Sequence, residues 1–191
     1  MTGHLRAVSP ERCVVALAIP VSERRFREHL ADIARHDFVR TTCPDWARYE
    51  AFARHIREFV RRFAARGVPV VENATLQQFE SCFATSQVVI LFAHWAAQAV
   101  EFDDGLAPVR RVVSAVPVSF DGVLDLCVCH PTALVVRLRR DRPNCLIKRT
   151  RGETSLLFWL QVYDVLFGLL RTEPMPYSTA LERVLLEFLR K

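Results

Sequence analysis

The chain has 191 residues, 51% of them hydrophobic and 25% charged, and its formal net charge is +5. A chain of this length forms one domain that folds without disulfides or metal, and the composition excludes wholesale disorder. The charge comes from arginines scattered along the chain without interleaved aromatic residues, which argues against a nucleic-acid-binding protein.

The sequence gives no sign of export or of a membrane anchor. Residues 1–12 lack the apolar core of a secretory signal, and the longest apolar stretch, 156–170, is interrupted by Gln161 and Asp164. We therefore expect a cytoplasmic protein with reduced cysteines and no membrane span. No glycine-rich turn follows a predicted strand, so we expect no nucleotide and no other cofactor.

Helix and strand patterns alternate along the chain. The strongest helix pattern has Pro44 in its first turn and Gly67 after its end. Ser22 is expected to cap a helix whose inner face carries Ile33. In chain order, the predicted elements are strand 14–19, helix 22–33, helix 44–66, strand 68–71, helix 75–83, strand 88–93, an irregular hairpin or loop at 100–105, helix 107–116, strand 123–129, helix 132–140, strand 144–148, and helices 154–170 and 177–190.

Strands separated by helices predict right-handed crossovers and a sheet with helices on both faces. The predicted fold class is therefore α/β, with a mostly parallel sheet of about five strands. We expect residues 13–191 to form this domain and residues 1–12 to form an N-terminal extension.

Reactive side chains follow two of the predicted strands. His94 comes directly after strand 88–93, and Cys127 and Cys129 lie at the end of strand 123–129. Sites of parallel sheets form at the carboxyl ends of the strands, and an imidazole beside a thiol holds it as the nucleophilic thiolate. The sequence thus predicts a histidine–cysteine pair. The alternative is that the cysteines belong to the core, where cysteines are common.

Three segments resemble the caspase-like cysteine proteases, and among them the CHAT-type domains common in bacteria. Residues 89–94 (VILFAH) resemble the strand that delivers the histidine, and residues 123–129 (VLDLCVC) resemble the strand that delivers the nucleophile. Residues 153–168 and 177–182 resemble the closing helices of the family. The resemblance covers residues 13 to 190 and implies a three-layer sandwich.

The resemblance also implies roles for single residues. His94 would be the general base, and Cys129 the nucleophile, whose backbone N–H would contribute to an oxyanion hole. In a register shifted by two residues, Cys127 would be the nucleophile and Asp125 would bind a basic side chain of the substrate. Trp95 stands where the family has glycine, so its side chain is expected to border the cleft.

Asp104, in the loop between the two strands, is a further candidate for lining the cleft; a solvated turn that includes Asp103 is the alternative. The implied function is that of a cysteine endopeptidase acting on a protein or peptide substrate, in a bacterial defence or cell-death system. A regulatory protein or a second copy of the chain would be its other partner. An inactive caspase-like scaffold is the alternative function, and Trp95 filling the cleft would favour it.

A metal site is the third hypothesis from the sequence. Cys127, Cys129 and His130, joined by His94 or Cys145, offer soft ligands. The spacing Cys-x-Cys-His is not usual for zinc, so we expect no metal.

Overall fold

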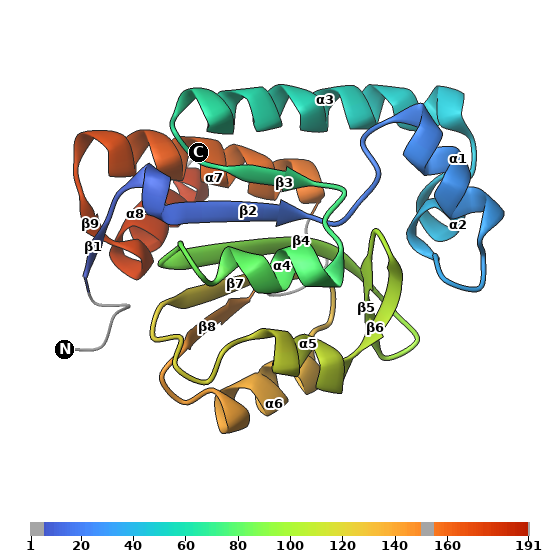
Figure 1. Cartoon of the computed structure of the whole chain (residues 1–191). Helices are drawn as coiled ribbons and strands as arrows, with labels where there is room; N and C mark the ends of the chain where they lie inside the picture. Colours follow the sequence, from blue (N-terminus) through green and yellow to red (C-terminus); the bar gives the residue numbers. More distant parts are fainter. Residues whose placement is uncertain (1–5, 150–154, 191) are drawn as a thin grey trace.

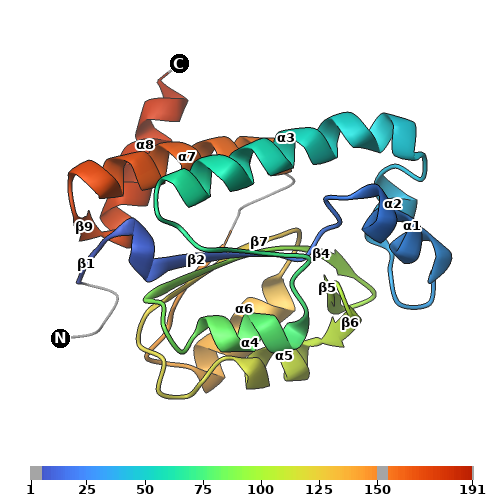
Figure 2. The ribbon, with the colours of Figure 1, turned by 45° about the horizontal axis from the view of Figure 1, so that its top comes forward.

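The computed structural model describes residues 6–149 and 155–190. A seven-stranded sheet lies between two layers of helices, and a separate pair of short strands joins the N-terminal segment to the connection between the last two helices (Figures 1 and 2). The predicted α/β class is confirmed. The sheet is mixed, and it is larger than the five strands expected.

The strands of the described residues are β1 (Ala7–Val8), β2 (Cys13–Leu17), β3 (Val70–Glu72), β4 (Val88–Ala96), β5 (Ala99–Phe102), β6 (Gly105–Pro108), β7 (Val123–Val128), β8 (Leu146–Arg149) and β9 (Met175–Pro176). The helices are the 3-10 helix η2 (Pro10–Arg12) and the α-helices α1 (Glu23–Ala31), α2 (Phe38–Thr42), α3 (Trp46–Ala65), α4 (Leu76–Cys82), α5 (Val109–Ala115), α6 (Thr132–Asp141), α7 (Leu156–Thr172) and α8 (Tyr177–Leu189).

Strand β4 is the centre of the sheet. It pairs in parallel with β2 and β7, and the sheet continues in parallel to β3 on one side and β8 on the other. The register sets Phe92 opposite Cys127 and Ala93 opposite Val128. The carboxyl ends of β4 and β7 therefore meet at one edge of the sheet.

Strand β4 extends three residues beyond the predicted strand and pairs there with β5 in antiparallel fashion, while β5 pairs with β6. The β4–β5 turn consists of Ala97 and Gln98, with φ angles of 48° and 60°. Positive φ at both turn residues is typical of a two-residue hairpin with the right-handed twist of its strands. The segment 100–105, expected to be an irregular hairpin or a loop, lies in the antiparallel β5–β6 hairpin.

Each face of the sheet has its own core, because successive side chains of a strand point to opposite faces. One face packs on α4, α5 and α6, and it takes Val89, Leu91 and Ala93 of β4. The other face packs on α3, α7 and α8, and it takes Ile90 and Phe92. Figure 2 shows the two helix layers on either side of the sheet.

Helices α1 and α2 lie with the start of α3 beside the β5–β6 hairpin (Figure 1). Ser22 caps α1 as expected, since its side chain accepts the backbone N–H of Arg25. The expected inner position of Ile33 is wrong. Helix α1 ends at Ala31, and Ile33, in the turn that follows, is 67% exposed.

The residues predicted as an N-terminal extension contribute structure of their own from Arg6 onward. Strand β1 pairs with β9 in antiparallel fashion, and Val8 is buried against the core that α7 and α8 cover. Among the described helices, none is both long and apolar enough to cross a lipid bilayer.

Candidate functional site

A cavity of about 300 Å³ opens at the sheet edge where β4 and β7 end. It lies on the sheet face covered by α3 and α7, and α2 closes one side. Its described lining residues are Ile19, Phe38, Thr42, Phe52, Phe92, Ala93, His94, Cys127, Val128, Cys129, Ser155, Leu156 and Trp159. The cavity thus brings together His94, Cys127 and Cys129.

His94 reaches the cavity because it shares a strand face with Phe92. Its Nε2 lies 3.2 Å from Oδ2 of Asp37, and the ring of Phe38 packs against it with 5.5 Å between ring centroids. The hydrogen bond fixes the ring and leaves Nδ1 as the other nitrogen for proton transfer.

Asp37 is a functional candidate that reading the sequence missed. It precedes the first residue of α2, and its carboxylate also binds Arg40. Partial burial raises the pKa of Asp37, but the hydrogen bonds from Arg40 and His94 outweigh it and lower that pKa below the ordinary value. The only local signal is an aspartate before a short helix, which is typical of a cap and says nothing of His94.

Cys129 lies one residue beyond β7, and its side chain is exposed. His130 follows with a φ of 49°, in the left-handed region that few residues other than glycine adopt. The chain therefore turns sharply after Cys129 before α6 begins at Thr132.

Cys127 has a different environment. It is half-buried, and its Sγ lies 3.1 Å from the hydroxyl of Tyr163. Burial and the nearby carboxyl of Asp125 raise the pKa of the Cys127 thiol well above its ordinary value. The thiol is therefore neutral at neutral pH, which does not suit a nucleophile.

Asp125 lies inside the core, two residues before Cys127 on the same strand face. It is 3% exposed, and its Oδ2 accepts the hydroxyl proton of Tyr177 at 2.7 Å. Burial raises the pKa of Asp125, which the hydrogen bond from Tyr177 only partly offsets. The residue is not among the described residues that line the cavity.

In the wild type, Asp125 is expected to make the unfolding free energy fall as the pH rises, and Asp125→Asn is expected to remove this dependence. Because the pKa is raised on folding, the folded chain keeps its proton where the unfolded chain has lost it, above about pH 4. The contribution of Asp125 to the unfolding free energy therefore falls by up to about 1.4 kcal/mol per pH unit until the folded-state pKa is passed. The asparagine still accepts the Tyr177 hydroxyl but does not titrate. Urea unfolding between about pH 4 and 7 measures this, and a difference between the two proteins that stays constant with pH would contradict it.

Trp95 and Asp104 do not reach the cavity. Trp95 follows His94, so it points to the opposite sheet face and packs against the core that α4, α5 and α6 cover. Asp104 Oδ1 accepts the backbone N–H of Leu76, the first residue of α4, at 3.0 Å. Its neighbour Asp103 is buried and forms an ion pair with Arg25. Both aspartates thus hold the hairpin against α1 and α4.

Within residues 6–149 and 155–190, one group of three potential metal ligands comes together: His29, His36 and Glu101, whose ligand atoms lie within 4.8 Å of one another. The cysteine-based set expected as an alternative does not form such a group among these residues. Burial and the neighbouring His36 lower the pKa of His29 to about 4, so its ring is neutral at neutral pH.

The site therefore consists of an apolar cavity with His94 and Cys129 at its edge, and of a buried group of histidines and carboxylates beside it. Comparisons of the chain with protein-family models, with curated proteins and with solved structures give no match.

Proposed function

We propose that this chain is a cysteine endopeptidase in which Cys129 is the nucleophile and His94 the general base. The observation that carries the proposal is that one cavity holds an exposed thiol and an imidazole oriented by a carboxylate. A sulfur nucleophile is activated by a nearby base and a third group that orients the base, and His94 and Asp37 are the candidates for these two roles.

In the proposed reaction, the Cys129 thiol gives its proton to His94 Nδ1, and the sulfur attacks the carbonyl carbon of a peptide bond. The C–N bond then breaks, and the amine leaves with the proton from His94. Water hydrolyses the resulting thioester, with His94 taking the proton from the water and returning it to the thiol.

Asp37 orients His94 in this proposal, and its own position is well supported. Glu101 Oε2 accepts the backbone N–H groups of Asp37 and Phe38 at 3.0 and 2.9 Å. Glu101 is also the cross-strand partner of His94 in the β4–β5 pair. Two strands and the loop before α2 thus fix the geometry of the base.

The lining of the cavity favours a bulky apolar side chain next to the cleaved bond. Most of the lining is aliphatic or aromatic, and among the described lining residues none is Asp, Glu, Lys or Arg. A charged substrate side chain would lose its hydration there without gaining an oppositely charged partner from these described residues. The shifted register, with Asp125 binding a basic side chain, has less support because Tyr177 holds that carboxylate in the core.

Trp95 filling the cleft would have favoured the scaffold alternative. Trp95 packs on the other sheet face, so this argument for an inactive protein does not apply.

Peptidyl electrophiles that differ only in the residue next to the reactive group test the proposal. The full chain is incubated with versions carrying Leu, Phe, Asp or Arg, and the modified cysteine is mapped by mass spectrometry. We expect an adduct on Cys129, formed fastest with Leu or Phe. Cys43 is a built-in control, since it is partly exposed and is not among the described residues lining the cavity. Equal labelling of Cys43 and Cys129 by all versions would refute the proposal.

A further inference from the structure

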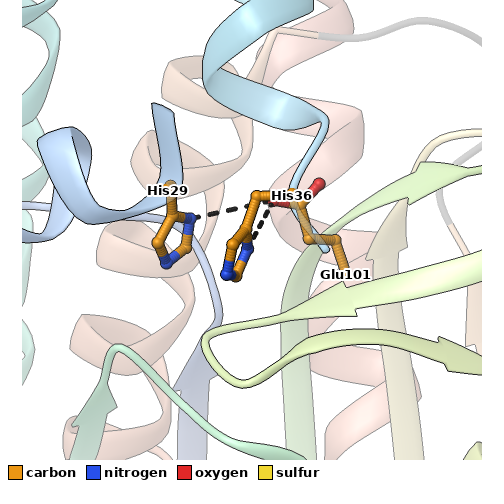
Figure 3. A group of neighbouring side chains, drawn as sticks. All are labelled: His29, His36 and Glu101. Atoms are coloured by element: carbon orange, nitrogen blue, oxygen red, sulfur yellow. Dashed lines mark hydrogen bonds and ion pairs between the residues drawn. The ribbon is translucent and has the colours of Figure 1, made fainter. Parts of the chain in front are cut away.

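The histidines of α1 and of the turn before α2 meet a glutamate of β5 in the interior of the protein. His29 is 1% exposed, His36 6% and Glu101 1%. Figure 3 shows both rings turning Nδ1 toward the same carboxylate oxygen. His36 Nδ1 lies 3.2 Å and His29 Nδ1 3.7 Å from Glu101 Oε1.

Nδ1 of His29 is buried and has no hydrogen-bond partner among the described residues. The other ring nitrogen, Nε2, lies 3.2 Å from Oδ1 of Asp103 and donates its proton to this carboxylate. Nδ1 faces Oε1 of Glu101 at 3.7 Å, which is too long for a hydrogen bond. A buried polar atom without a partner is costly, and a cation between Nδ1 and the carboxylate oxygen would supply a partner for both.

We propose that His29, His36 and Glu101 bind a zinc ion through Nδ1, Nδ1 and Oε1. Two imidazoles and one carboxylate form a ligand set that zinc uses in proteins, with water as the fourth ligand. With bonds of about 2.0–2.1 Å, ligand atoms of a tetrahedral zinc site lie about 3.3 Å apart. The observed separations of 3.2 and 3.7 Å are close to this value.

The groups around the three ligands are also those of a metal site. A histidine that binds a metal usually donates its other N–H to a carboxylate, as His29 does to Asp103. Glu101 is fixed through Oε2 by two backbone N–H groups, which leaves Oε1 for the ion. The two rings are stacked with 16° between their planes, so their in-plane lone pairs run nearly parallel. Each ring would have to turn about χ2 for both lone pairs to point at one ion.

The ion would join α1 and the turn before α2 to β5, whose Glu101 lies 65 positions after His36. The turn that carries His36 continues into Asp37, so zinc would also fix the residue that orients His94. This last consequence rests on the proposed function, whereas zinc binding itself does not.

The test measures metal content and thermal stability of the full chain, not peptidase activity. Purified wild-type protein should hold close to one zinc per chain, and chelation should remove it. Adding zinc at about 100 times its Kd should raise Tm by roughly 5 °C or more, since binding to the folded state alone stabilises it. Magnesium should cause no such shift, because it prefers oxygen ligands.

Variants locate the ion. His29→Gln and His36→Gln should weaken zinc binding by more than about 100-fold, and Asp103→Asn by about 10–100-fold. Glu101→Gln is the sharpest variant: its amide can keep the backbone hydrogen bonds and donate to His29 Nδ1. It should therefore keep the metal-free Tm and lose the response to zinc, which separates loss of the site from loss of the fold.

His55→Gln, on the exposed face of α3, is the matched control and should bind zinc like the wild type. Wild-type protein that neither holds zinc nor gains stability from it would overturn the proposal. So would zinc binding that survives Glu101→Gln but is lost in Cys129→Ala, because the ion would then lie in the cavity.

Discussion

Cys129→Ala is expected to lower kcat/KM for a peptide with a bulky apolar residue before the cleaved bond by about 10³-fold or more. Loss of the attacking atom removes the covalent route, and nucleophile deletions in comparable enzymes have effects of this size or larger. Cys127→Ala should cost less than about tenfold, or 1.4 kcal/mol of barrier. It leaves a small space in the cavity wall and removes the sulfur beside the Tyr163 hydroxyl, but it removes no reacting atom.

The comparison of these two variants decides which of the two cysteines is the nucleophile. The cysteines are two residues apart and both line the cavity, and each variant loses the same SH group. The assay needs a fluorogenic peptide and equal Tm values for the two proteins. Cys43→Ala is the control for a change of cysteine outside the cavity. A larger loss of activity in Cys127→Ala than in Cys129→Ala would make Cys127 the nucleophile.

Gly122→Ala is expected to lower the unfolding free energy by about 2–3 kcal/mol, and Tm by roughly 5–10 °C. A methyl group at this position would overlap the carbonyl oxygen of Gln87 and lie 2.6 Å from Cζ of Phe120. The backbone there has no room to move, because Val123 N–H binds Gln87 O and Leu146 N–H binds Gly122 O, both at 2.9 Å. The methyl group would therefore push β7 away from β4 at the start of the pairing.

Gly168→Ala is the matched control for this substitution, with the opposite sign. Gly168 lies within α7, and the nearest atom to an added methyl group is the end of the flexible Arg66 side chain, 3.1 Å away. Alanine is about 0.8–1 kcal/mol more favourable than glycine inside a helix, so stability should stay equal or rise slightly. Chemical denaturation of the three proteins measures both effects. If both variants lost the same stability, the close approach of β7 to Gln87 would not be the cause.

Much of the sheet could be predicted because its signals are local. The apolar runs at 88–93 and 123–129 form β4 and β7. His94 follows the first run directly, and Cys129 ends the second. The helix predicted at 44–66 is α3, and Gly67 after it has a φ of 83°. The spacing of apolar residues and the residue types that end a helix depend only on neighbouring positions in the chain.

Contacts across the chain could not be predicted in the same way. Asp37 and His94 are 57 positions apart, and nothing near either residue points to the other. His29 and His36 look like isolated histidines until the fold stacks their rings and brings Glu101 close to both of them. The position of Trp95 could not be predicted either. The expectation that it borders the cleft assumed that the strand ends before it, whereas β4 continues to Ala96 and turns the Trp95 side chain to the other sheet face.

The pattern of residues along the chain predicts the α/β class, the order of the main elements and the sheet edge at which His94, Cys127 and Cys129 meet. These follow from periodicity, because alternation along a strand and the parallel pairing of strands joined by helices are properties of the backbone. The packed fold is needed to see that Cys127 is more buried than Cys129, that Asp37 binds His94, and that His29 and His36 share Glu101. Burial and long-range hydrogen bonds arise when whole layers pack together, and no local pattern of residues encodes them.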